Sequence, residues 1–77
     1  METMVQPKIT GYRQLTENEV ALANEGKALA ETCGAYIEKL RADRSVSLDQ
    51  RWISIGATDL QLGFMAVIRG ILQPTTF

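Results

Sequence analysis

The sequence predicts an all-α protein, a hairpin of two long antiparallel helices that follows a short N-terminal arm. Its two prolines, Pro7 and Pro74, lie near the ends, so the strongest helix breaker is absent from everything between them. Two segments of this interval carry apolar residues in alternating steps of four and three, which is the spacing of an amphipathic helix. We therefore expect a single domain that consists of an arm (1–15), a first helix (16–43), a second helix (47–72) and a tail (73–77).

The first helix begins at a capping sequence. Thr16 is suited to the N-cap position, and Glu19, three residues later, completes a capping box. One face is apolar, with a main row flanked by Ala23, Ala30 and Ile37. The main row is Leu22, Gly26, Leu29, Cys33, Tyr36 and Leu40. This face is expected to pack against the second helix.

The second helix is predicted to start at another capping box, formed by Ser47 and Gln50, and to stop before Pro74. Its apolar row is Ile53, Ala57, Leu60, Phe64, Val67 and Ile71. The opposite side is also partly apolar, at Ile55, Leu62, Met65 and Leu72. Since a lone hairpin has only one inside, this second apolar side predicts a homo-oligomer.

Glycines at 56, 63 and 70 recur every seven residues beside the apolar row of the second helix. Each costs about 1 kcal/mol relative to alanine inside a helix. The repeat favours a close approach by another backbone, and the alternative is tolerated sequence drift.

The size and composition of the chain exclude several common sources of stability for a small domain. A chain of 77 residues buries only roughly 60–65% of the surface that its unfolded form exposes, so a core this small is marginal. There is one cysteine, Cys33, and no histidine, so an intrachain disulfide is impossible and a zinc site would be unusual. We expect no metal and no cofactor, and self-association as the remaining source of stability.

Charge and hydropathy argue against two classes of partner, nucleic acids and membranes. Eight Lys and Arg against nine Asp and Glu give a net charge of −1, which argues against binding to DNA or RNA. No uninterrupted apolar run reaches the length of a membrane span, and the N-terminus METMVQPKIT lacks the apolar stretch of a signal peptide. The expectation is a cytoplasmic protein with no membrane partner.

Catalysis is not expected. There is no histidine to act as a base, and neither a nucleophile elbow nor a phosphate-binding glycine loop occurs. Cys33 falls on the apolar row of the first helix, where a buried, inert thiol is the simpler interpretation. The carboxylates near helix ends are explained by capping and solvation.

The arm carries the first candidate ligand-binding residues. Tyr12 lies between two cations, Lys8 and Arg13. A tyrosine ring offers a flat surface for a nucleobase, and Lys and Arg donate hydrogen bonds to phosphate oxygens. The alternative is that Tyr12 anchors the arm to the helices.

Two more candidates lie in the helices. Lys27 stands at the border of the first apolar stripe, where it is placed to reach an anion between subunits; the alternative is an i,i+4 pair with Glu31. Arg69 lies on the outward side of the second helix and points either into a pocket between subunits or into solvent. The residues alone predict a helical oligomer with an anion-binding arm.

Several segments are similar to the small phage-encoded anti-CBASS sponge proteins. They are LTENE (15–19), NEGK (24–27), DQRWISIGATDLQLGFM (49–65) and RGILQPTTF (69–77). The resemblance implies a non-enzymatic homohexamer of helical hairpins. Such a protein sequesters the cyclic dinucleotides, such as cyclic GMP-AMP, with which the CBASS defence of a bacterium activates a cell-killing effector. Family members also hold cyclic trinucleotides in separate pockets.

The resemblance also implies roles for single residues. Tyr12 matches the tyrosine that stacks on a base of the cyclic dinucleotide, and Lys27 matches the lysine that engages its phosphates. Arg69 is the candidate for the trinucleotide pocket. Lys8 and Arg13 are proposed from their chemistry alone. The alternative function is a small helical adaptor that binds a host protein through its outward apolar residues.

Overall fold

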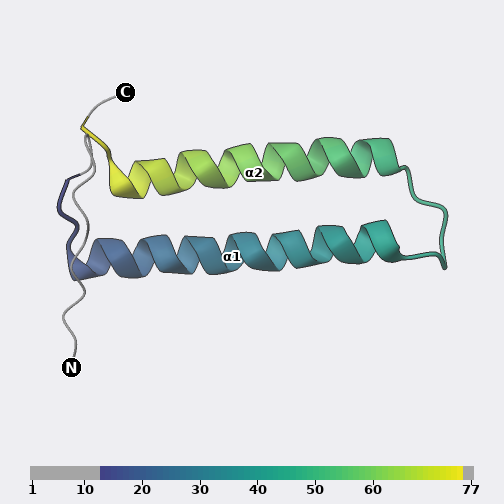
Figure 1. Cartoon of the computed structure of the whole chain (residues 1–77), viewed down its shortest axis with the longest axis horizontal. Helices are drawn as coiled ribbons and strands as arrows, with labels where there is room; N and C mark the ends of the chain where they lie inside the picture. Colours follow the sequence, from purple (N-terminus) through teal and green to yellow (C-terminus); the bar gives the residue numbers. More distant parts are fainter. Residues whose placement is uncertain (1–12, 76–77) are drawn as a thin grey trace.

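The structure is a computed structural model, and it describes residues 13–75. It contains two helices, α1 (Glu17–Ala42) and α2 (Gln50–Leu72). The helices run antiparallel, side by side, and residues 43–49 connect them at one end (Figure 1). The segment that enters α1 and the segment that leaves α2 lie together at the other end (Figure 1). The predicted two-helix hairpin is confirmed.

The start of α1 follows the predicted capping box. The Thr16 hydroxyl accepts a hydrogen bond from the Glu19 N–H at 3.2 Å, and the Glu19 carboxylate accepts one from the Thr16 N–H at 2.8 Å. Both bonds satisfy backbone groups that the first turn of a helix leaves without partners. At the other end the chain turns extended at Asp43, whose carboxylate accepts the Ser45 N–H at 2.8 Å. Hydrogen bonds from Ser45 lower the pKa of Asp43.

The predicted start of α2 is wrong. The N-cap is Asp49 instead of Ser47, and the helix begins at Gln50 instead of residue 47. The Asp49 carboxylate accepts hydrogen bonds from the N–H groups of Arg51 at 3.1 Å and Trp52 at 3.3 Å. A full negative charge at this position also interacts favourably with the helix dipole, which a serine hydroxyl does not offer.

The end of α2 agrees with the expected stop. Gln73 adopts the left-handed conformation (φ 46°), and its N–H donates to the Arg69 carbonyl at 2.8 Å. Pro74 follows directly and has no N–H with which to continue the helix.

Small residues of α1 form the contact between the helices. Ala23, 7% exposed, is the most buried residue of the described chain, and Gly26 lies one turn further on. A Cβ built on Gly26 would be 2.8 Å from Cδ1 of Ile68. The contact line continues through Ala30, Cys33, Ile37 and Leu40, which are all half-buried. The absence of a side chain at Gly26 makes room for the side chain of Ile68.

The predicted apolar row of α1 is therefore half wrong. Leu22, Leu29 and Tyr36 are each more than half exposed, although they alternate with contact residues in the predicted row. The flanking residues Ala23, Ala30 and Ile37 face α2 in their place. The helix is thus rotated so that its bulkiest apolar side chains remain outside the hairpin.

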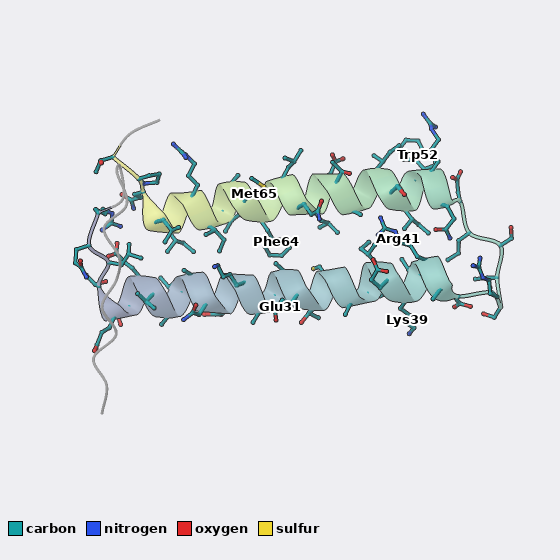
Figure 2. The ribbon with its side chains drawn as sticks, in the orientation of Figure 1. Glu31, Lys39, Arg41, Trp52, Phe64 and Met65 are labelled. Atoms are coloured by element: carbon teal, nitrogen blue, oxygen red, sulfur yellow. The ribbon has the colours of Figure 1, made fainter. Side chains whose placement is uncertain are left out.

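A similar rotation occurs in α2. Phe64 points between the helices (Figure 2), and Ile53, Ala57 and Ile71 are half-buried as predicted. Leu60 and Val67, from the same predicted row, are exposed. Ile68, which the predicted row omits, makes the contact with Gly26 instead.

The hairpin leaves much of α2 uncovered. Leu62 and Met65 are both more than half exposed. By length and apolar composition α2 is also able to cross a membrane, and it is the one such helix within residues 13–75. An apolar helix packed on several sides in a soluble protein meets the same description, so this property indicates mainly that α2 has more apolar surface than α1 covers.

Candidate ligand-binding site

A groove runs along one side of the hairpin, between α1 and α2, with a volume of about 1100 Å³. Its polar lining combines Lys27, Glu31 and Arg41 of α1 with Gln61 and Arg69 of α2. Apolar walls come from both helices; Met65, Glu31 and Arg41 are labelled in Figure 2. The groove lining includes a second carboxylate, Glu38, to which Arg41 donates at 2.9 Å. Three cationic side chains against two carboxylates thus line the groove, whereas the whole chain has net charge −1. This side of the hairpin is suited to a small anion.

Helix geometry explains why Lys27 and Arg69 share this groove. Gly26 and Ile68 meet across the hairpin, and each next residue turns by about 100° around its helix. Because the helices are antiparallel, this rotation carries the next residue of each helix to the same side of the hairpin. Lys27 follows Gly26 and Arg69 follows Ile68, so both lie on that side. Both line the groove. The fold thus brings two predicted cations, Lys27 and Arg69, to one surface although they are 42 residues apart in the sequence.

The groove offers the two kinds of contact that a nucleotide needs. Lys27 and Arg69 are able to donate charge-assisted hydrogen bonds to phosphate oxygens. Thr58 and Gln61 add neutral polar groups, while Phe64 and Met65 add apolar surface for a base. Within residues 13–75 no group of three or more acidic, cysteine or histidine side chains is placed to hold a metal ion.

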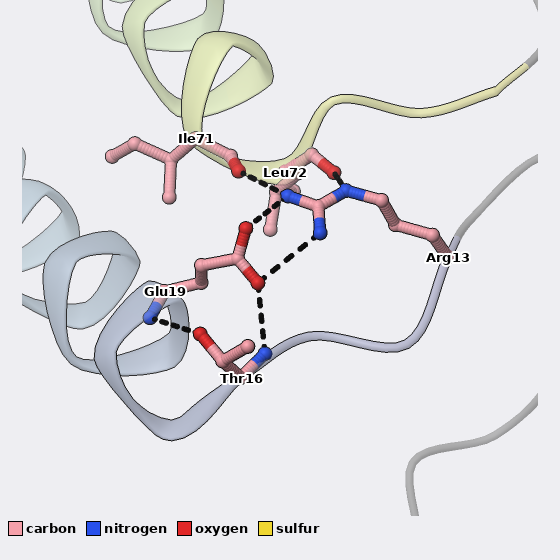
Figure 3. Close-up of polar contacts among 5 residues, drawn as sticks. All are labelled: Arg13, Thr16, Glu19, Ile71 and Leu72. Carbon is pink, nitrogen blue, oxygen red and sulfur yellow. Dashed lines mark hydrogen bonds and ion pairs between the residues drawn. The ribbon is translucent and has the colours of Figure 1, made fainter.

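Arg13 lies in a different place, at the end of the hairpin where the chain enters α1 (Figure 3). Its Nε donates to the Leu72 carbonyl at 3.1 Å, and Nη2 donates to the Ile71 carbonyl at 3.2 Å. Nη1 donates to Oε1 of Glu19 at 3.1 Å, and Nη2 donates to Oε2 of the same carboxylate. We call this set of four hydrogen bonds the Arg13 clasp. It joins the N-terminal end of α1 to the C-terminal end of α2.

The clasp sets the ionisation of its members. Hydrogen bonds from Arg13, and then from the Thr16 backbone, lower the pKa of Glu19 from 4.5 to about 2. The hydrogen bond with Glu19 raises the pKa of Arg13. Both groups are therefore charged at neutral pH. The carboxylate stands at the positive end of the α1 dipole and the guanidinium at the negative end of the α2 dipole, so both dipoles favour the pair.

The predicted site residues fall into three groups. Lys27 and Arg69 line the groove. Arg13 is engaged in the clasp, and its predicted role as a phosphate ligand stays a prediction. Lys8 and Tyr12 lie outside the described residues.

Some residues of this region had no sequence-based prediction. Gln61 and Arg41 line the groove, and nothing in their spacing distinguishes them from ordinary surface residues. Glu19 was predicted only as a capping residue. Its second role depends on Arg13, six residues earlier, and on carbonyls 58 and 59 residues away from that arginine. No local pattern encodes a contact of that range.

The side of the hairpin opposite the groove is apolar. We define the apolar face as Leu22, Leu29, Tyr36 and Val67, which are all more than half exposed and absent from the groove lining. Gly56, Gly63 and Gly70 lie beside it on α2, and a Cβ on each would meet no atom within 4 Å. The described hairpin therefore does not use these glycines for its own packing, and the predicted close approach there remains a prediction about another chain.

A two-helix hairpin with a cation-lined groove on one side and an apolar face on the other defines a small binding domain. A protein-family model described as the Acb2/Tad1 hairpin domain matches residues 7–72, so the chain belongs to that family. Among known proteins it is similar to "Anti-CBASS protein 2" of Pseudomonas phage JBD67. The two are 28% identical over an alignment that covers 87% of this chain and 92% of the phage protein. The predicted family is confirmed.

Proposed function

We propose that this protein is a phage anti-defence sponge. It binds and sequesters the cyclic dinucleotides of CBASS, such as cyclic GMP-AMP, without cleaving them, so that the host effector is not activated. Its place of action is the cytoplasm of the infected bacterium. Family membership and the anti-CBASS name of the JBD67 relative support this function. The observation that carries it is the groove, where Lys27 adds positive charge for the dinucleotide phosphates to an otherwise acidic chain.

The proposed ligand contacts are an aromatic stack and a cation. A cyclic dinucleotide has two bases and two phosphates, and a two-fold assembly presents the same residue twice. Tyr12 stacks on a base, and Lys27 from each of two copies engages a phosphate. Two converging lysines create a local positive site for a dianion even though the net charge is −1.

The proposed assembly is a homohexamer, in which the apolar face and the exposed apolar residues of α2 are covered by other copies. The exposed side chains of Leu29 and Val67 support this assembly, since full burial of such a side chain contributes up to about 1.5–3 kcal/mol. The glycine row of α2 leaves room for a neighbouring backbone. Arg69 is proposed to serve a second set of pockets that hold cyclic trinucleotides.

Titration calorimetry with cyclic GMP-AMP tests the proposed contacts. Tyr12→Ala and Lys27→Ala are each expected to abolish binding while the assembly keeps its mass. Lys39→Ala is the matched control, because Lys39 is also an exposed lysine of α1 but points away from α2 (Figure 2). Wild-type affinity in Lys27→Ala would contradict the proposed function.

A second candidate is a helical oligomeric adaptor that binds a host protein. The exposed apolar side chains of Leu62 and Met65 on α2 favour it. Specific capture of one host protein, lost in Met65→Asp, together with no binding of cyclic GMP-AMP, would support the adaptor over the sponge.

A further inference from the structure

The Arg13 clasp stands where the N-terminal arm meets the hairpin. Arg13 directly follows Tyr12 in the chain. All three nitrogens of the guanidinium donate hydrogen bonds, and their acceptors belong to the first turn of α1 and the last turn of α2. Such a set fixes the position of the backbone from which the arm departs.

We propose that Arg13 is a positioning residue: the clasp holds the chain at residue 13, where the arm joins the hairpin, against the C-terminal end of α2, and thereby supports the ligand contact proposed for the neighbouring Tyr12. This inference rests on the proposed function. It gives Arg13 a different role from the phosphate contact expected from its chemistry.

The geometry argues against a phosphate contact. A phosphate on the Arg13 guanidinium would have to replace the Glu19 carboxylate or lie beside it. Replacement leaves Glu19 without its cation, and the second arrangement brings two anions together. The acceptors already present include two carbonyls of α2 that have no partner within their own helix. The clasp therefore satisfies both helix ends and leaves the guanidinium committed to the hairpin.

The fork shape of arginine matters here. The guanidinium is planar and donates in several fixed directions at once, which allows one side chain to bond a carboxylate and two carbonyls. A lysine ammonium keeps the charge but concentrates it at a single atom. Arg13→Lys therefore preserves any simple attraction for phosphate while it removes most of the clasp.

Whether residues 13–16 are held in place before the ligand binds affects the binding affinity through conformational entropy. A segment that is already held in its bound position does not lose that freedom when the ligand binds. Loss of the clasp leaves the contacts of Lys27 intact but frees residues 13–16, which the ligand must then order when it binds. The expected result is weaker binding with an unchanged assembly.

Glu19→Gln distinguishes positioning from direct contact. This variant removes the carboxylate but leaves the charge of Arg13. If Arg13 positions the arm, cyclic GMP-AMP binds about tenfold more weakly to both Glu19→Gln and Arg13→Lys. If Arg13 contacts a phosphate, Glu19→Gln releases the guanidinium for the ligand, and affinity stays the same or improves. That second result would overturn the proposal.

Asp49→Ala is the matched control for stability. It removes the N-cap of α2 at the opposite end of the hairpin (Figure 1). This variant is expected to lower the Tm as other lost caps do, but to keep the wild-type affinity. A comparable loss of affinity in Asp49→Ala would reduce Arg13 to a general structural role and would overturn the proposal.

Hydrogen–deuterium exchange without ligand separates this proposal from the proposed function. In Glu19→Gln, the amides of residues 13–16 and of residues 71–75 (Pro74 excepted) are expected to exchange faster together. Failure of the wild type to bind cyclic GMP-AMP would refute the sponge but leave this test in force. Unchanged exchange at both segments would show that the clasp does not hold the arm.

Discussion

The two sides of the hairpin differ in what they leave for a partner. The groove side presents Lys27 and Arg69 among polar groups and has a hollow of about 1100 Å³. The apolar face presents large side chains. Beside it on α2 lies the row of glycines, where an added Cβ would meet no atom within 4 Å. A small charged ligand suits the first side, and another protein surface suits the second. In the proposed function, the first side is the binding site and the second is the assembly surface of the same 77 residues.

The largest expected effect comes from a charge on the apolar face. Leu29→Glu is expected to break the assembly, because burial of a leucine contributes about 1.5–3 kcal/mol per copy and a buried unpaired carboxylate costs more. Light scattering coupled to size exclusion should show a much lower mass than for the wild type. Ala28→Glu is the control, since it adds the same charge at the adjacent exposed position of α1. Equal masses for wild type and Leu29→Glu would mean that the apolar face is not covered.

A change on the groove side is expected to alter binding but not mass. Arg69→Ala should weaken the binding of a cyclic trinucleotide by roughly 1.5–3 kcal/mol, or about ten- to a hundredfold in affinity. This is the range for a hydrogen bond to a charged group. Cyclic GMP-AMP should bind as before. Arg51→Ala serves as control, since Arg51 lies over the Trp52 ring at the opposite end of α2, outside the groove lining. Equal losses for both ligands would place Arg69 in a shared pocket.

Much of this arrangement follows from the sequence, and the features that sequence patterns do not predict have physical causes. The capping box at Thr16 and the stop at Pro74 depend on neighbouring residues, so local patterns identify them. The rotation of the helices does not follow in the same way. Leu29 and Val67 repeat with the period of a buried row, but periodicity does not tell whether the row packs on the other helix or on another chain.

The residues that line the groove follow from the sequence only in part. Lys27 and Arg69 were identified by chemistry and resemblance, and both line the groove. The clasp was not predicted, because Arg13 reaches carbonyls at the far end of the chain. The N-cap of α2 was misplaced because Ser47 and Asp49 both have capping side chains and only the fold decides between them.

A medium effect is expected at the contact line that separates the two sides. Gly26→Val should lower the stability of the protein by about 1–3 kcal/mol, since added carbons meet Ile68 and must move α2. Thermal unfolding measures it. Gly34→Val is the control, because a Cβ there meets no atom within 4 Å and glycine itself is unfavourable in a helix. An unchanged Tm in Gly26→Val would show that the helices are not closely packed at this point.

The smallest expected effect concerns pH and the Arg13 clasp, at the end where both sides of the hairpin begin. The pKa of Glu19 is lowered from 4.5 to about 2, so its stabilising contribution is complete above pH 4.5 and is lost as the pH falls through about 2. The Tm difference between wild type and Glu19→Gln should shrink over that interval. It should be modest throughout, because both members of the ion pair are partly exposed. A difference that grows on acidification would contradict the lowered pKa.

The most direct measurement concerns the fate of the ligand. The protein is incubated with cyclic GMP-AMP, filtered to remove free nucleotide, then denatured, and the released nucleotide is analysed by chromatography. A sponge is predicted to retain the nucleotide while folded and to release it intact, in proportion to the protein present. A cleaved product would contradict sequestration, and no retained nucleotide would contradict binding.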